Sequence, residues 1–431
     1  MKRLLLVFIV FVIVLSGCQG GEPEAVVETE PTQPPPTKTE EPTVVPATET
    51  ALPPTEEPQT AEFAELEQAL QAALDAQVEA GFPGALLMVD APDLGFYWKG
   101  AAGMADVDGE VPMEPDTPFR ISGITNVMMG ALVLRLAEEG MLDLDDPISY
   151  TLDPAIIEQL NGPDGESYGE AITVRQLLNG TSGNAGYFFA DEEDADRNYK
   201  SDFTEVISED PDKIWSPEEI ITYTTDNLEP VSAPGKTFVP NDLGYVLLGL
   251  VVESVTGEGL DAAYQTWLFE PLSMQQTFMV QAGETRLENV AHVYAMKGLD
   301  VSDLASLSWF SGDVVTTVDD LKQFMRAWAD GEIFSDPASM EAMTEWVSMA
   351  DAGFSGLSYG LGVMQFDFNE LDRPDIDTII GYPSIWNGFL FYWPKYNIVY
   401  AGTINQFVPL SAYGDLSGQI LMTLLPYVTD E

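Results

Sequence analysis

The fold is decided by residues 119–140, which read FRISGITNVMMGALVLRLAEEG. From about Gly123 to Glu139 this stretch predicts a helix, because apolar side chains recur on almost every side of the helical wheel and Gly140 ends the run. A helix of that kind must be buried on all sides. The stretch therefore predicts a central helix inside a domain with further layers of structure around it.

Strand and helix patterns lie on both sides of this helix. Apolar runs bounded by turn residues predict strands, and apolar residues three and four apart predict helices. The flanking elements are predicted, in chain order, as a helix from about Glu62 to Gly81, strands Ala85–Val89 and Leu94–Lys99, a mainly helical middle with acidic loops, a hairpin of Phe389–Trp393 and Ile398–Ile404, and a last helix near Leu416–Leu425. This order predicts an α/β fold of the α+β kind, with helices packed on an antiparallel sheet and a helical region inserted.

The N-terminus carries the pattern of an export signal. Two basic residues precede an apolar run from Leu4 to Leu15, which is shorter than the roughly 20 residues that span a bilayer. The residues that end at Cys18, Leu-Ser-Gly-Cys, resemble the bacterial lipobox, in which the cysteine is lipidated and becomes the mature N-terminus. A plain secretory signal with a chance cysteine is the alternative. We expect residues 1–17 to be a lipoprotein signal peptide and Cys18 to anchor an extracytoplasmic protein to a bacterial membrane.

Residues 18–61 differ in composition from the rest of the chain. Pro, Thr and Glu dominate and large apolar side chains are few, so the segment buries too little surface to offset the entropy of folding. We expect a disordered, extended linker that holds the folded domain, residues 62–431, away from the membrane.

Charge and cysteine content exclude several classes of function. The chain of 431 residues has a formal net charge of -54, which repels nucleic acid. It holds one cysteine and one histidine, so we expect no internal disulfide, no zinc site and no cofactor. An acidic run at residues 191–196 is the place where carboxylates could bind calcium. We expect a solvated loop there, because the run lacks the spacing and turn glycine of a calcium loop.

Several stretches together resemble the β-lactamase-related serine hydrolases, which include the penicillin-binding proteins and the class C β-lactamases. The matching stretches are 81–85 (GFPGA), 113–121 (MEPDTPFRI), 138–147 (EEGMLDLDDP), 173–178 (TVRQLL), 181–183 (TSG), 244–249 (GYVLLG), 315–321 (VTTVDDL) and 359–362 (YGLG). Their common order across the domain carries the resemblance. It implies a β-lactamase/transpeptidase-like α/β/α sandwich with an inserted helical region, a site in the cleft between the two, and three catalytic motifs.

The first implied motif is Ser-x-x-Lys at the start of the buried helix, where the lysine lies one turn from the serine and helps to deprotonate it. By the resemblance, Gly123 stands at the nucleophile position and Asn126 at the lysine position. Glycine offers no nucleophile, and an amide is not a base near neutral pH. The first motif therefore predicts no acyl transfer.

The other two implied motifs are also altered. In residues 234–245, PGKTFVPNDLGY, Pro240 replaces the tyrosine and Asp242 the asparagine of Tyr-x-Asn. The third motif, His-x-Gly or Lys-Thr-Gly, is implied at the start of the strand that lines the cleft. Tyr382 replaces its His or Lys and Ser384 its Gly, so a side chain should crowd any substrate on that strand.

These replacements predict a pseudoenzyme that keeps the fold and has lost acyl transfer. The alternative is an active serine hydrolase with a non-standard site, either an esterase, a D-amino-acid peptidase or a β-lactamase-like enzyme. Ser122 lies one residue early, which turns its side chain by about 100° on a helix, and we expect it to cap the helix instead. A histidine-assisted serine would need His292, which we expect to be an ordinary surface or packed side chain.

An inert cleft is still able to bind. Gly123 is expected to leave space where a side chain stood, with its backbone N–H pointing into an anion pocket. The candidate ligand-binding residues are Gly123, Asn126, Asp242, Tyr382, Ile385 and Trp386. The expected partners are a cell-wall peptide, a glycan or another protein, besides the membrane. A purely structural surface protein without a ligand is the third possibility.

Overall fold

The computed structural model describes residues 63–160, 162, 168–187, 206, 213–280, 284, 286–295, 298–302, 314–370, 373–384, 388–406 and 410–429. Its contacts divide the chain into Met1–Glu57 and Pro58–Glu431, and all described residues belong to the second unit. The signal peptide with Cys18, the linker up to residue 61, the acidic run at 191–196, Ile385 and Trp386 lie outside the described residues. The expectations for them stay predictions.

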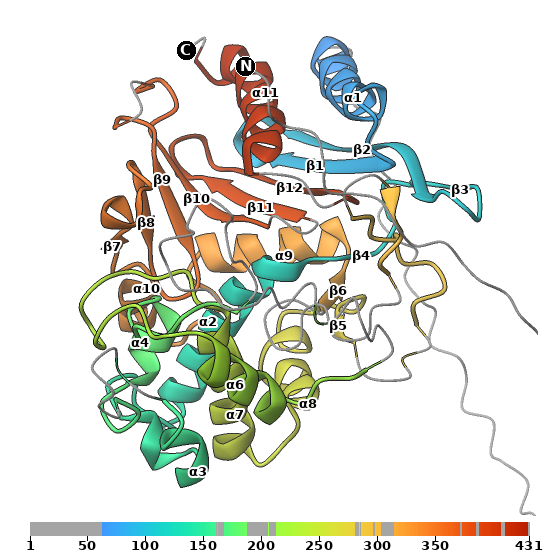
Figure 1. The fold of residues 1–431 in the computed structure, drawn as a ribbon. Coiled ribbons are helices and arrows are strands. Elements are labelled where there is room, and N and C mark those ends of the chain that lie inside the picture. The colour runs from blue at the N-terminus through green and yellow to red at the C-terminus, as the bar shows by residue number, and fades with distance from the viewer. Residues whose placement is uncertain are drawn as a thin grey trace, which may run out of the picture. The chain divides into compact units, whose positions relative to one another are not determined.

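A nine-stranded sheet forms the middle of the domain, in the order β3-β2-β1-β12-β11-β10-β9-β8-β7 (Figure 1). All of its neighbouring strands are antiparallel. The strands are β1 (Gly84–Ala91), β2 (Phe96–Asp106), β3 (Val111–Pro112), β7 (Val347–Ser348), β8 (Leu357–Tyr359), β9 (Met364–Asp367), β10 (Thr378–Pro383), β11 (Gly388–Trp393) and β12 (Ile398–Ile404). The first and last strands of the described sequence, β1 and β12, are neighbours, so the two ends of the domain meet inside one sheet.

Helices cover both faces of this sheet, because successive side chains of a strand point to opposite sides. Helices α1 (Ala64–Glu79) and α11 (Leu410–Thr429) lie together on one face, and α9 (Val318–Ala329) lies on the other (Figure 1). The alternation is visible in β1: Leu86 belongs to the core under α9, and Leu87 to the core under α1 and α11. Each face of the sheet thus has its own large apolar core, with a third, small cluster around Tyr359, and the fold is the predicted α/β/α sandwich.

The helical region lies on the α9 side, around α2 (Thr125–Glu138) (Figure 1). Eleven of the 14 residues of α2 are buried, which confirms the predicted central helix. The surrounding helices are α3 (Pro154–Ile157), α4 (Val174–Leu178), α6 (Pro217–Asn227), α7 (Asp242–Thr256), α8 (Leu260–Tyr264), the π-helix η6 (Gln265–Phe269) and α10 (Pro337–Met343). Short 3₁₀ turns are η2 (Pro92–Leu94), η3 (Ser122–Ile124), η4 (Ile148–Tyr150), η8 (Ala350–Ala352) and η9 (Pro394–Tyr396).

A second, three-stranded sheet fixes the entry to α2. It consists of β4 (Phe119–Arg120), β6 (Val314–Thr316) and β5 (Phe278–Met279), in the order β4-β6-β5. The backbone N–H of Ile121 donates to the carbonyl of Val314 at 3.0 Å, directly before η3 begins. The η3 turn in turn packs on β10 and β11. The start of α2 is therefore held between the two sheets.

No single helix in the described ranges is long and apolar enough to cross a membrane. Helix α7 and the following segment Leu260–Phe269, which contains α8 and η6, are together long and apolar enough, but the two are bent by 77° relative to each other. Most residues of α7 are buried in the core around α2, so packing inside the domain explains their apolar character.

Candidate functional site

The start of α2, the end of β10 and the start of α7 bring the predicted motif positions into one region. Gly123 lies in η3 and Asn126 in the first turn of α2, while Tyr382 belongs to β10 and Ser384 follows it. The third motif, Tyr382 to Ser384, was predicted at the start of a strand, and this prediction is wrong. Strand β10 begins at Thr378 and ends at Pro383, so the motif lies at the end of the strand.

The Tyr382 ring lies over Gly123. A Cβ built on Gly123 would come within 2.7 Å of Tyr382 Cε1, a distance that real Cβ contacts essentially never show. The ring therefore occupies the space into which a side chain at position 123 would extend. The expected empty space above Gly123 is wrong, because the Tyr382 ring lies against the turn at which α2 starts.

The backbone N–H of Gly123 also has a partner within the chain. It donates to Ser384 Oγ, and the N···O distance is 3.2 Å. Ser384 is buried, and its own N–H donates to the carbonyl of Gly388 at 2.7 Å, which holds the residue in place. The N–H that was expected to point into an anion pocket is thus satisfied by the replacing serine.

Asn126 holds the other end of the Tyr382 side chain. Its Nδ2 donates to the Tyr382 hydroxyl at 3.0 Å, and Asn126 itself is 6% exposed. Its Oδ1 is buried and accepts no hydrogen bond within the described part of the chain. Asn126 therefore positions the phenol of Tyr382, and an amide in this place supplies no base for a nucleophile.

Three tyrosines continue the network away from α2. The Tyr382 hydroxyl shares a hydrogen bond with that of Tyr359, which in turn lies 2.9 Å from the hydroxyl of Tyr245. Tyr245 donates onward to the carbonyl of Leu178 at 3.2 Å. The sequence analysis treated Tyr245 and Tyr359 only as parts of matching stretches, and it did not predict that they lie in the site. The available signal was their position beside a glycine of those stretches, since Tyr245 follows Gly244 and Tyr359 precedes Gly360.

Burial raises the pKa of all three phenols, that of Tyr245 and Tyr359 well above the usual value. For Tyr382 the negative charge of Asp242 adds to the increase. A raised pKa keeps each phenol neutral at physiological pH. No tyrosinate is then present among these three residues to act as a base.

The second motif borders this network through α7. Pro240 is exposed, and Asp242 is the first residue of α7, partly buried. Between them, Asn241 caps the helix by accepting from the N–H of Gly244 at 2.9 Å, and its Nδ2 donates to Ser182 Oγ at 2.6 Å. The sequence analysis missed this cap, although Asn directly before an apolar helix is a common cap signal.

Neither alternative catalytic residue is arranged for serine chemistry. Ser122 belongs to η3 with φ at +45°, and the structure gives it no capping bond, so the expected helix cap is wrong. The short 3₁₀ turn moves the start of α2 to Thr125 and takes Ser122 out of the cap position. His292 Nδ1 lies 2.7 Å from Asp300 Oδ2, and its backbone N–H donates to Ala105 of β2. Among the described residues, no hydrogen bond joins His292 to a serine hydroxyl.

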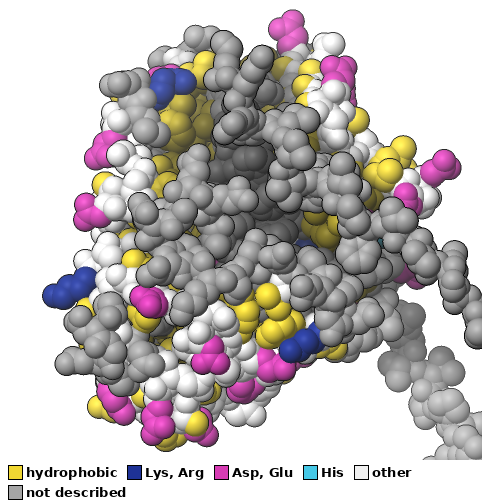
Figure 2. All heavy atoms as spheres, in the orientation of Figure 1, with side chains coloured by type: hydrophobic (Ala, Val, Ile, Leu, Met, Phe, Trp, Pro, Cys, Tyr) yellow, Lys and Arg dark blue, Asp and Glu magenta, His cyan; other side chains and the backbone are white. Residues whose placement is uncertain are grey.

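Charged groups are mostly acidic on the face shown in Figure 2, where carboxylates are spread along the outline and only a few basic side chains are visible. Groups of three or more His, Cys, Asp or Glu side chains that could hold a metal ion are not found in the described ranges. The candidate ligand-binding set stays a prediction, since Ile385 and Trp386 lie outside those ranges.

Comparisons with known proteins agree with this fold. Among curated proteins, Protein flp of Staphylococcus aureus (strain MW2) is 29% identical over 200 residues, which cover 46% of this chain and 35% of that protein. Esterase EstB of Burkholderia gladioli is 31% identical over 196 residues, or 44% of this chain and 45% of the esterase. The chain thus spans about a third to under half the length of these relatives.

Among solved structures, a D-stereospecific amidohydrolase from Streptomyces sp. superposes with a TM-score of 0.64 at 27% identity, covering 79% of this chain and 94% of that chain. The model of the Beta-lactamase family matches residues 63–421, which is nearly the whole described domain. With the antiparallel sheet, the buried α2 and the motif order in place, this chain belongs to the β-lactamase family of serine hydrolases and penicillin-binding-protein-like proteins.

Proposed function

We propose that this protein is a catalytically inactive member of the β-lactamase family, displayed outside the cytoplasm on a lipid attached to Cys18, and that it acts by binding. The observation that carries the inactivity is the position of Tyr382. Its ring fills the space of a side chain at position 123, the place of the family nucleophile.

Acyl transfer needs a nucleophile, a base within hydrogen-bond reach and donors for the oxyanion. Gly123 supplies no nucleophile, and Asn126 supplies no base. The N–H of Gly123, which would be an oxyanion donor, is bonded to Ser384 at 3.2 Å. These observations support inactivity, and the neutral tyrosines offer no replacement for the base.

The lipid anchor rests on sequence alone. The only cysteine of the chain stands at the lipobox position, after an apolar run of signal-peptide size. A Pro/Thr/Glu-rich linker follows, as expected for a domain held away from a membrane. Together they support presentation of the domain to a cell-wall peptide, a glycan or another protein.

An active serine hydrolase is the second candidate, supported by the 31% identity with Esterase EstB over 196 residues. The two candidates differ in one measurement. The wild-type protein and a Ser122→Ala variant are incubated with a fluorescent penicillin and with a fluorophosphonate, and labelling is followed on gels and by intact mass. We expect no stoichiometric label. Labelling that maps to one serine, and that Ser122→Ala removes, would establish the hydrolase instead.

A rescue series tests the reason for inactivity. We expect Gly123→Ser alone to stay inactive, because catalytic groups act as a unit. Recovery should need at least Asn126→Lys as well, with Pro240→Tyr. The structure supports a further requirement, since the Tyr382 ring must move aside before a serine fits at position 123. Activity of the single Gly123→Ser variant would show that the site has been assigned incorrectly.

A further inference from the structure

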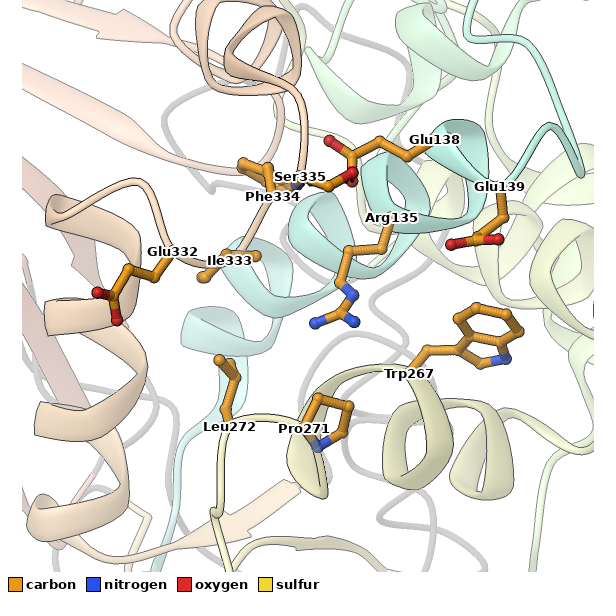
Figure 3. A pocket seen from close by; sticks show the side chains of 10 residues that line it. All are labelled: Arg135, Glu138, Glu139, Trp267, Pro271, Leu272, Glu332, Ile333, Phe334 and Ser335. Carbon is orange, nitrogen blue, oxygen red and sulfur yellow. Dashed lines mark hydrogen bonds between the residues drawn. The ribbon is translucent and has the colours of Figure 1, made fainter.

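A cavity of about 320 Å³ lies at the other end of α2. Its walls come from the last turn of α2, from η6 with the residues after it, and from the segment after α9 (Figure 3). Since α2 has 14 residues at about 1.5 Å each, this cavity is about 20 Å from Gly123. It is therefore separate from the family cleft. Its size is within the range of small-molecule sites.

The guanidinium of Arg135 points into this cavity from α2 (Figure 3). Within the described residues, it makes no hydrogen bond and no ion pair. The neighbouring carboxylate of Glu138 is turned away from it, and accepts from the N–H and hydroxyl of Ser335, the N–H of Asp336 and the hydroxyl of Ser339 at 2.7–3.0 Å. A guanidinium has five donors, and in this partly buried position only water or a ligand can accept from them.

Burial lowers the pKa of Arg135, and the negative charges of Glu138 and Glu139 partly oppose this shift. Guanidinium still keeps its charge at neutral pH, because its usual pKa is far above 7. A planar, charged and partly dehydrated fork is the side chain that binds carboxylates with two parallel hydrogen bonds.

Apolar side chains line the cavity around this charge. Trp267 and Pro271 lie on one side of the guanidinium, and Leu272 and Ile333 on the other (Figure 3). Trp267 belongs to the π-helix η6, a rare local structure that often marks functional sites because it redirects a side chain. These walls fit the apolar body of a ligand.

Two further carboxylates, Glu139 and Glu332, line the same cavity and are exposed. Neither has a hydrogen bond or ion pair within the described ranges. They would repel a simple anion, as would the net charge of the chain, -54. Glu139, whose negative charge also acts on Arg135, lies on the side of the guanidinium where Trp267 is, and would attract a cationic group on a ligand whose carboxylate is held by Arg135.

From these contacts we propose that the cavity binds a zwitterion with an apolar side chain, in the class of free amino acids. The carboxylate pairs with Arg135, the ammonium group faces Glu139, and the side chain lies against Trp267, which is on the same side of the guanidinium as Glu139. This site is distinct from the family cleft, and it does not depend on whether the cleft is catalytic.

Arg135 also stabilises α2 simply by its place in the last turn, where a positive charge is favourable. Two variants separate this role from binding. Arg135→Lys keeps the charge on the helix end but loses the planar fork, and Arg135→Met removes both. Arg373→Met is the matched control, because Arg373 is an exposed arginine outside the cavity, paired with Asp375.

The test is calorimetric titration of the detergent-solubilised full chain with phenylalanine, phenethylamine and 3-phenylpropionate, which share one apolar body. We expect phenylalanine to bind, and each of the other two to bind about tenfold more weakly or worse. Arg135→Lys should weaken phenylalanine binding by about tenfold and Arg135→Met should abolish it. Arg373→Met should bind like the wild type.

Unfolding transitions of every variant show whether it is folded. No binding of phenylalanine by the folded wild type at millimolar concentration overturns the proposal. Equal binding of phenethylamine overturns the role of Arg135, and tighter binding of 3-phenylpropionate overturns the role of Glu139. If Arg135→Met does not fold, wild-type affinity in folded Arg135→Lys is enough to reject the proposal.

Discussion

The contact of Tyr382 with Gly123 makes a quantitative prediction about stability. Gly123→Ala adds a single methyl group, and its carbon would lie 2.7 Å from Tyr382 Cε1. Overpacking of this kind costs about 1–3 kcal/mol. Replacing a glycine by alanine at a compatible backbone also stabilises by about 0.4–1 kcal/mol through the unfolded chain. We therefore expect a net loss of about 1–2 kcal/mol in the free energy of unfolding.

The matched control is Gly418→Ala, the same change in helix α11. A Cβ at Gly418 meets nothing within 4 Å. We expect this variant to be more stable than the wild type by about 0.5–1 kcal/mol. Both are measured by denaturant unfolding, where a shifted midpoint with unchanged slope reports stability.

A double-mutant cycle identifies Tyr382 as the cause. Tyr382→Phe keeps the ring carbon, so the penalty of Gly123→Ala should persist in that background. Tyr382→Ala removes the ring, so the penalty should disappear and the two changes should be non-additive. A Gly123→Ala variant as stable as the wild type, or an equal penalty in the Tyr382→Ala background, would show that the ring does not lie over Gly123.

Three further predictions concern the rest of the chain. Cys18→Ser should abolish metabolic lipid labelling and release the protein from membranes; unchanged fractionation contradicts the anchor. Limited proteolysis should cut between residues 19 and 60 and leave a stable core beginning near Glu62; a core that unfolds contradicts an independent linker. Burial raises the pKa of Tyr359 in the folded protein above that of the same phenol in the unfolded chain. The free energy of unfolding is therefore unaffected by Tyr359 below pH about 10, and it falls as the pH rises further, because the phenol then ionises in the unfolded chain but not in the folded protein. Tyr359→Phe should reduce that loss in unfolding curves taken from neutral to alkaline pH, and an identical pH dependence rejects the assignment.

Elements with a strong local pattern could be predicted from the sequence. The predicted start of α2 near Gly123 differs by two residues from the observed start at Thr125, and the hairpin of β11 and β12 was placed within one residue. Apolar side chains dominate both elements, so burial alone decides their conformation. The last helix was predicted too short, since α11 begins at Leu410, where small and polar residues hide the helical period.

The site could be predicted only in part. Motif spacing placed Gly123, Asn126, Tyr382 and Ser384 at matching positions of the family, and the structure brings these four together. Gly123 and Ser384 are 261 positions apart in the sequence. Motif spacing does not predict how the side chains of such distant residues point toward each other. Spacing therefore predicted free space above Gly123, whereas in the folded chain the Tyr382 ring lies there.

The replacements at the site depend on one another physically. Tyr382 fits over the start of α2 only because residue 123 has no Cβ, since a carbon there would overlap the ring. Asn126 Nδ2 donates a hydrogen bond to the phenol at 3.0 Å. A lysine in this buried position would instead need a negatively charged partner. Ser384 accepts a hydrogen bond from the backbone N–H of Gly123. Gly123, Asn126, Tyr382 and Ser384 thus fit one another, so changing any one of them alone leaves a clash or an unpaired polar atom.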